Sequence, residues 1–261
     1  MIETLSSDKN PLLKDVRKAV ARGSLTESGF AVAESFHLLE EALGAGCEVQ
    51  AILVAESVKN TVSAHVRGLK RTRVLAVRDG IFAQLASTES TQGVIALVRP
   101  PEWTLEQLLR GKSLVVVVDG VQDPGNAGAI VRAAEAFGAT GAAFLKGSVS
   151  PYNPKAMRAS AGSVFRLPLA VSADEDLLLA ALDQKRVALY AAMPGGGSAP
   201  AQVDLTGRTA IVMGGEGRGV SPKLAQKATA LKIPTSGVES LNAAVAAGVL
   251  LYEARRQRTG S

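Results

Sequence analysis

One junction in the chain constrains its fold more than any other feature. Residues 114–118 form an uninterrupted apolar run, and the turn sequence Asp119-Gly-Val-Gln-Asp-Pro-Gly-Asn126 follows directly. A short apolar run bounded by turn residues is typical of a buried strand. Asn126 then lies near the start of a helix, with Arg132 about two turns along it. Because ligands bind at the carboxyl ends of strands in open α/β sheets, this junction predicts an active edge.

The sequence beyond this junction continues to alternate between strand and helix patterns. The expected strands are residues 141–145, 187–192, 210–214 and 231–233, and the expected helices are residues 126–137 and 241–256. Such alternation favours a parallel sheet covered by helices.

The first hundred residues indicate a separate small α/β unit. The expected helices are residues 11–21, 35–43 and 79–85, and the four expected strands are residues 30–34, 49–54, 73–77 and 93–98. Pro100 and Pro101 then favour an extended connection. We therefore expect a domain at residues 1–98, a linker at 99–112 and a second domain at 113–261.

The charge balance is basic and points to a partner that carries phosphates. The net charge is +5 and the isoelectric point is near 9.4. The basic residues gather in the N-terminal segment and again near residue 70. The expected RNA-binding residues are Lys14, Arg17, Lys18, Arg22, Lys70 and Arg71. The alternative interpretation of both clusters is a pair of solvated helix faces.

Other classes of protein fit the sequence poorly. Cys47 is the only cysteine, and His37 and His65 are the only histidines, so we expect neither an internal disulfide nor a bound metal. The apolar runs are shorter than the ~20 residues that a membrane span needs, and the first residues lack a signal-peptide pattern. We expect a cytoplasmic protein.

Two further motifs lie late in the chain. Residues 211–222 carry glycines at 214, 215, 217 and 219 directly after an expected strand, which allows close ligand approach. Dinucleotide binding is a weak alternative, because the loop is late and lacks an acidic residue downstream for the ribose. In the third motif, residues 233–248, either Ser240 or Asn242 begins a helix.

Taken in this order, the motifs resemble the SpoU (TrmH) family of RNA ribose 2′-O-methyltransferases, in the SPOUT superfamily. The matching segments are Asp123-Pro-Gly-Asn-Ala-Gly-Ala-Ile-Val-Arg132, Met213-Gly-Gly-Glu-Gly217, Ile233-Pro234 and Ser240-Leu-Asn242, with residues 158–168 also similar. The resemblance covers about residues 113–256. It implies a parallel-sheet α/β domain with a C-terminal deep trefoil knot, preceded by a small α/β substrate-binding domain. It also implies a homodimer that binds S-adenosylmethionine.

The resemblance also assigns the site residues. The implied catalytic residues are Arg132, Asn126, Glu216, Ser240 and Asn242. The implied cofactor-binding residues are Met213, Gly214, Gly215, Gly217, Ile233, Pro234, Ser240, Leu241 and Asn242. Arginine is cast as the base in this family, but its guanidinium is effectively always protonated. We therefore expect Arg132 to hold the target phosphate and to stabilise the developing alkoxide.

The resemblance thus implies methylation of a ribose in structured RNA, with 23S ribosomal RNA as the favoured substrate and transfer RNA as the alternative. An alternative from another functional class, a non-catalytic RNA-binding or ribosome-assembly protein, remains open. A nicotinamide-dependent enzyme is a third, weaker possibility.

Overall fold

The computed structural model describes residues 2–5, 7–65 and 72–260. The chain folds into two compact units. The N-terminal unit comprises Met1–Pro101 together with Tyr152–Phe165, and the C-terminal unit comprises Glu102–Pro151 and Arg166–Ser261. The chain therefore passes from one unit to the other three times. The domain bounds expected from the sequence stay a prediction.

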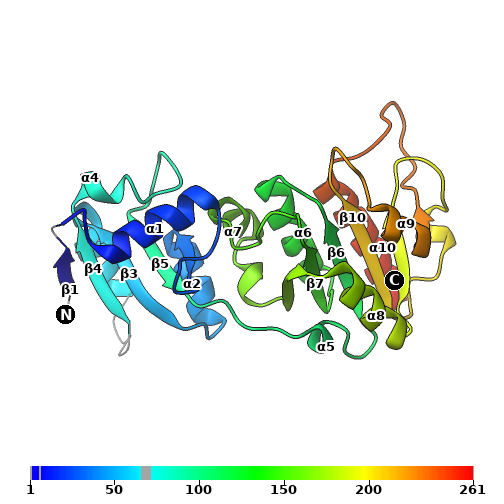
Figure 1. Cartoon of the computed structure of the whole chain (residues 1–261), viewed down its shortest axis with the longest axis horizontal. Helices are drawn as coiled ribbons and strands as arrows, with labels where there is room; N and C mark the ends of the chain where they lie inside the picture. Colours follow the sequence, from blue (N-terminus) through cyan, green and yellow to red (C-terminus); the bar gives the residue numbers. More distant parts are fainter. Residues whose placement is uncertain (1, 6, 66–71, 261) are drawn as a thin grey trace. The chain divides into compact units, whose positions relative to one another are not determined.

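The N-terminal unit is built on a mixed five-stranded sheet with the order β1-β4-β3-β5-β2 (Figure 1). The strands are β1 (Ile2–Leu5), β2 (Ala31–Glu34), β3 (Val49–Ala55), β4 (Arg73–Val77) and β5 (Val94–Val98). Strands β1, β4 and β3 run parallel, whereas β5 is antiparallel to β3 and β2. Strand β1 was not expected from the sequence, because this edge strand is short and partly exposed.

Four α-helices of this unit lie among the described residues of the first hundred. They are α1 (Pro11–Arg22), α2 (Phe36–Gly44), α3 (Lys59–His65) and α4 (Asp79–Phe82). Helix α1 buries Leu13, Val16 and Ala19 against the core of the sheet. These residues recur at the spacing of one helical face, which is why this segment forms an amphipathic helix. Helix α4 is shorter than expected.

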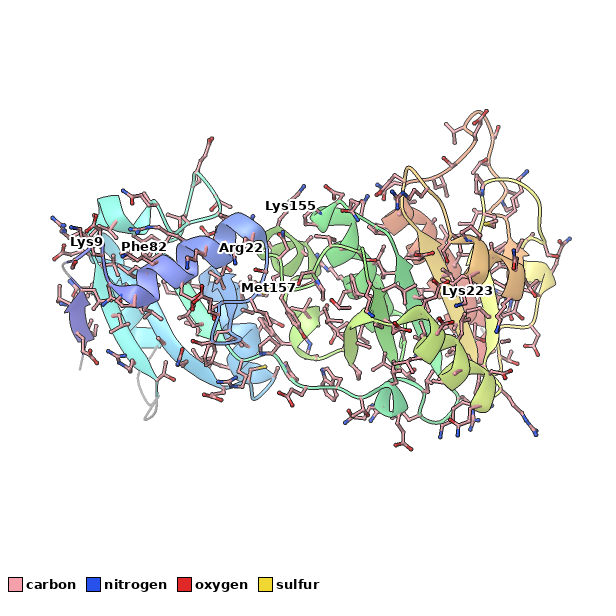
Figure 2. The ribbon with its side chains drawn as sticks, viewed as in Figure 1. Lys9, Arg22, Phe82, Lys155, Met157 and Lys223 are labelled. Atoms are coloured by element: carbon pink, nitrogen blue, oxygen red, sulfur yellow. The ribbon has the colours of Figure 1, made fainter. Side chains whose placement is uncertain are left out.

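A helix from later in the chain completes the N-terminal unit. Helix α7 (Pro154–Ser160) packs on β2. Met157 is fully buried, whereas Lys155, two positions earlier, is exposed (Figure 2). Arg158 lies 3.6 Å from the carboxylate of Glu34, which is only 4% exposed. The same carboxylate accepts hydrogen bonds from Ser87 N at 2.8 Å and from the Thr88 hydroxyl at 2.7 Å. The buried Glu34 carboxylate is therefore hydrogen-bonded and paired with a guanidinium.

The C-terminal unit contains a six-stranded sheet with the order β11-β9-β10-β6-β7-β8, in which every pairing is parallel. The strands are β6 (Leu114–Asp119), β7 (Gly141–Leu145), β8 (Leu169–Ala173), β9 (Ala188–Ala192), β10 (Thr209–Gly214) and β11 (Thr229–Leu231). The expected parallel α/β class is confirmed. The last strand was placed wrongly at residues 231–233, and β8 was not expected, because only one end of this edge strand is buried.

Helices cover both faces of this sheet. The helices are α5 (Leu105–Leu108), α6 (Pro124–Ala136), α8 (Glu175–Gln184), α9 (Pro222–Lys227) and α10 (Ala243–Thr259). Leucines of α5, α8 and α9 share a core with Val115, Val117 and Val212. Side chains alternate along a strand, so the other face is left for α6 and α10, which pack against each other (Figure 1).

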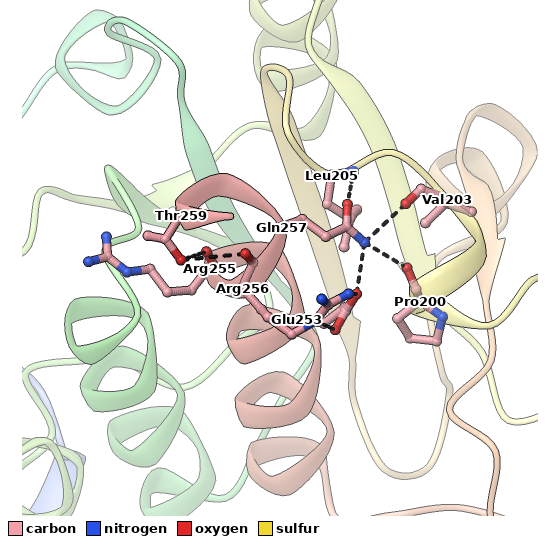
Figure 3. Close-up of polar contacts among 8 residues, drawn as sticks. All are labelled: Pro200, Val203, Leu205, Glu253, Arg255, Arg256, Gln257 and Thr259. Carbon is pink, nitrogen blue, oxygen red and sulfur yellow. Dashed lines mark hydrogen bonds and ion pairs between the residues drawn. The ribbon is translucent and has the colours of Figure 1, made fainter. Parts of the chain in front are cut away.

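The last turn of α10 is tied to the loop that precedes β10. Gln257 Nε2 donates to the carbonyls of Pro200 and Val203, each at 3.2 Å, and its Oε1 accepts from Leu205 N at 2.9 Å (Figure 3). Arg258 donates to the carbonyls of Leu205 at 2.9 Å and Lys112 at 2.8 Å. The C-terminal helix is therefore fixed by backbone acceptors from two distant parts of the chain. The trefoil knot itself stays an expectation.

Candidate active site

The loop between β6 and α6 presents the first polar group of the site. The Asp123 side chain accepts from Asn126 N at 2.8 Å and so caps α6, with Pro124 in the first helical position. The helix therefore begins two residues earlier than expected, and Asn126 lies in its first turn. Ser148 supports the preceding turn, because its hydroxyl accepts from Gly120 N and donates to the Val118 carbonyl, both at 2.9 Å.

The glycine loop, residues 214–221, follows β10 and passes close to this turn. A Cβ atom on Gly214 would overlap the backbone of Gly219 and Val220, and one on Gly215 would overlap the Gly120 carbonyl. Backbone packs directly against backbone at both positions, so neither admits a side chain.

Three polar residues from the three motifs form one chain of hydrogen bonds. Asn242 Oδ1 accepts from Ala244 N at 2.9 Å and Val245 N at 3.3 Å, which caps α10. Its amide nitrogen must then point outward, and it donates to Asn126 Oδ1 at 2.9 Å. Asn126 Nδ2 in turn donates to a carboxylate oxygen of Glu216. The helix cap therefore fixes the direction of the whole chain of hydrogen bonds.

A cavity of about 420 Å³ lies at the carboxyl ends of β9, β10 and β11. Of the predicted cofactor-binding residues, seven line it: Met213, Gly214, Gly215, Gly217, Ile233, Ser240 and Leu241. Glu216 lines it too, whereas Pro234 and Asn242 are not among its lining residues. The volume is within the ~300–1,000 Å³ usual for small-molecule sites.

Several lining residues were not expected from the sequence. Ala192 ends β9 and Met193 and Pro194 follow it, while Arg218 and Glu239 add charged groups from two loops. The first three could have been found, because the end of a neighbouring parallel strand meets the same sheet edge. Nothing in the local pattern marks Arg218 or Glu239.

Arg132 stands apart from this cluster. It lies six residues after Asn126 on α6, a rise of about 9 Å along the helix. Its side chain is exposed, and it is not among the lining residues of the cavity. Arg132 therefore lies outside the cavity.

The predicted RNA-binding residues divide into three groups. Lys14 and Arg22 are exposed on α1. Arg17 donates to the Asp8 carbonyl at 3.2 Å, and Lys18 pairs with Glu27 at 3.0 Å. Lys70 and Arg71 lie outside the described residues.

The described residues offer neither a membrane span nor a metal site. Across residues 2–5, 7–65 and 72–260, no helix is both long and apolar enough to cross a membrane. Within the same ranges, no group of histidine, cysteine and acidic side chains is arranged to hold a metal ion.

Both parts of the chain match known protein families. The SpoU rRNA Methylase family matches residues 113–252, and the MRM3-like substrate binding domain matches residues 10–96. The chain is 30% identical to the 23S rRNA (guanosine(2553)-2′-O)-methyltransferase RlmP of Bacillus subtilis, over 97% of this chain and all of the relative. It is 34% identical to the 23S rRNA (guanosine-2′-O-)-methyltransferase RlmB of Xanthomonas campestris, over 80% of this chain and 95% of the relative.

Solved structures of methyltransferases also match nearly the whole chain. The SpoU methyltransferase AviRb from Streptomyces viridochromogenes, in complex with AdoMet, matches with a TM-score of 0.88 at 26% identity, covering 97% of this chain and 100% of that one. An AdoMet-bound rRNA methyltransferase from Sinorhizobium meliloti matches with a TM-score of 0.83 at 28% identity, covering 98% of each chain.

Proposed function

Because the chain belongs to the SpoU rRNA methylase family, we propose that it methylates a ribose 2′-hydroxyl of 23S ribosomal RNA, with S-adenosylmethionine as the methyl donor. One observation of the structure carries this proposal. Asn126, Glu216 and Asn242, from three motifs far apart in sequence, join in a single hydrogen-bonded chain beside the cavity.

The cavity fits the cofactor. Met213, Leu231 and Ile233 supply apolar wall for an adenine ring. In the described part of the chain, no hydrogen bond engages the N–H of Ile233 or Leu241, so both are available to a ligand. When bound, S-adenosylmethionine supplies an activated methyl group on a sulfonium centre. Backbone groups around the cavity would bind and orient it.

The protein must also help the ribose hydroxyl to lose its proton. When the hydroxyl gives up its proton to solvent water, negative charge develops on the ribose oxygen, which would then attack the methyl group of the bound cofactor. A positioned cation stabilises that charge. We assign this role to Arg132, together with a contact to the target phosphate, because a guanidinium binds phosphate oxygens with two donors. Ser240, on the cavity wall, completes the proposed site.

We propose that the N-terminal unit recruits the RNA through the exposed Lys14 and Arg22 of α1, assisted by Arg17, Lys18, Lys70 and Arg71. The chain then works in the cytoplasm, as suits an enzyme that acts on ribosomal RNA.

We further propose that two copies associate through α10. Val245, Val249 and Tyr252 recur at helical spacing on this helix and are 52%, 40% and 56% exposed. The Tyr252 ring packs edge-on against Phe137 of α6 at 5.8 Å between centroids. Such an exposed apolar stripe is typical of an association surface. Sedimentation of Val249→Glu should show a monomer where the unaltered chain sediments as a dimer.

The test of function uses RNA from cells that lack the protein. Purified protein and methyl-labelled S-adenosylmethionine are incubated with ribosomal RNA or with transfer RNA, and 2′-O-methylation is mapped by resistance to alkaline cleavage. We expect one protected position in 23S RNA. A protected position in transfer RNA would instead select the alternative substrate. RNA binding without any methyl transfer, in protein shown by calorimetry to bind neither S-adenosylmethionine nor NAD, would identify an assembly factor.

A further inference from the structure

Asp119 is the last residue of β6 and has no role in the proposed reaction. It contacts both ends of the glycine loop. Its backbone carbonyl accepts from Gly215 N at 2.8 Å, where the loop begins. Its carboxylate accepts from Ser221 N at 2.6 Å, where the loop ends. One residue on the neighbouring strand therefore closes the loop at both ends.

Between these two contacts, the loop is also held by the bond from Asn126 to Glu216 and by the buried side chain of Val220. Residues 216–219 are exposed, and two of them are glycines, which have the widest backbone freedom. Inside the loop, one backbone bond joins Gly219 N to the Gly215 carbonyl at 2.8 Å. The exposed residues 216–219 therefore depend on the contacts at both ends of the loop for their position.

This same segment forms one wall of the cavity. Residues 214–219 all line it, and Glu216 reaches from the loop to Asn126. A loop that left its position would change the cavity wall and would also separate Glu216 from Asn126.

The far end of the loop is tied to a second element. The Ser221 hydroxyl donates to the carboxylate of Glu175, at the start of α8, at 2.9 Å. Ser221 thus presents its N–H to Asp119 and its hydroxyl to Glu175. The two contacts fix the orientation of the residue that leads into α9.

We propose that Asp119 is the positioning residue of the site: it holds the glycine loop in the one conformation that binds the cofactor and places Glu216 against Asn126. This inference rests on the proposed function for the identity of the cofactor. A carboxylate suits the task, because a hydrogen bond from N–H to a charged acceptor is stronger than one to a neutral acceptor.

The test compares Asp119→Ala, Asp119→Asn and the control Asp176→Asn in the full chain. Asp176 is an exposed residue of α8 that pairs with Lys223, so the control removes a nearby charge without touching the loop. For Asp119→Ala we expect binding of S-adenosylmethionine to weaken about 10–100-fold, which corresponds to about 1.4–2.7 kcal/mol. The KM for RNA should stay unchanged. The affinity of Asp119→Asn for S-adenosylmethionine should lie between those of the unaltered protein and Asp119→Ala, because the carboxamide oxygen can still accept from Ser221 N.

Amide hydrogen exchange separates positioning from a general loss of stability. In Asp119→Ala the Gly219 and Ser221 amides should exchange faster, while the central amides of β10 stay protected. Unchanged cofactor binding would overturn the proposal, and so would uniformly faster exchange across the unit. If the unaltered protein bound no S-adenosylmethionine, the proposed function would fail by itself. Exchange at Ser221 would then still decide whether Asp119 holds the loop.

Discussion

At the scale of single residues, Asn242 shows how one side chain serves both structure and site. Asparagine is a common helix N-cap, and the Asn242 side-chain oxygen accepts hydrogen bonds from the first N–H groups of α10. Because that oxygen faces the helix, the amide nitrogen, which can only donate, faces Asn126 and bonds to its Oδ1, which selects the orientation of the Asn126 amide. The structural role of this residue and its proposed role in the site are therefore not alternatives.

Arg132 offers the sharpest test of the chemistry. Arg132→Ala should reduce methyl transfer at least ~10²-fold, a loss typical of a transition-state contact, and leave affinity for S-adenosylmethionine nearly unchanged. The reason is its exposed position away from the cavity wall. Single-turnover kinetics and calorimetry measure the two quantities, with the exposed Arg110→Ala as control. Full turnover by Arg132→Ala would remove this residue from the mechanism.

Ser35 carries backbone strain that a substitution can release. Its φ of 140° and ψ of 161° lie in a region that only glycine adopts easily. Ser35→Gly should remove about 1–3 kcal/mol of backbone strain. Against this, it loses a few tenths of a kcal/mol with the hydrogen bond from Leu38 N to the serine hydroxyl, and about 0.5–1 kcal/mol because glycine has more conformational entropy in the unfolded chain. Urea denaturation should show the free energy of unfolding rise by about 1 kcal/mol. The control is Ser24→Gly, at a residue without positive φ, which should lower the free energy of unfolding. If both variants were less stable than the unaltered chain, Ser35 would not be strained.

At the scale of elements, the sequence predicted most accurately the strands whose pattern depends only on neighbouring residues. Strands β4 and β7 were placed without error, since in each of them at least four consecutive residues are buried. Edge strands β1 and β8 were not predicted because half-buried strands carry weak patterns. The motifs identified polar candidates, but the hydrogen bonds among Asn126, Glu216 and Asn242 depend on how distant loops meet.

The glycine loop gives a test at this scale. Gly214→Val should abolish S-adenosylmethionine binding in a folded chain, because its Cβ would displace Gly219 and Val220 on the far side of the loop. The control is Gly195→Val, where a Cβ meets no atom within 4 Å. Circular dichroism checks folding and calorimetry measures binding. A Gly214→Val protein that binds the cofactor normally would show that the loop tolerates displacement.

At the scale of the whole molecule, the proposal divides the work between the two units. The double variant Lys14→Ala with Arg22→Ala should bind 23S RNA more weakly, and its affinity should fall less steeply with salt. The log–log slope should become shallower by roughly one unit for each phosphate that the protein no longer neutralises. The control pair Lys185→Ala with Lys227→Ala removes the same charge from the C-terminal unit. Equal salt slopes for both pairs and the unaltered chain would mean that α1 does not contact the RNA backbone.

The passage of α7 into the N-terminal unit also affects how the chain emerges during its synthesis. The sheet of that unit is complete once Pro101 has been made, but the helix that packs on β2 ends only at Ser160. At roughly 5–20 residues per second, the ribosome needs several more seconds to deliver it. Until then Glu34 lacks Arg158, and strands β6 and β7 leave the exit tunnel before the first unit is finished. In nascent chains, the N-terminal unit is therefore completed only after part of the C-terminal unit has already been synthesised.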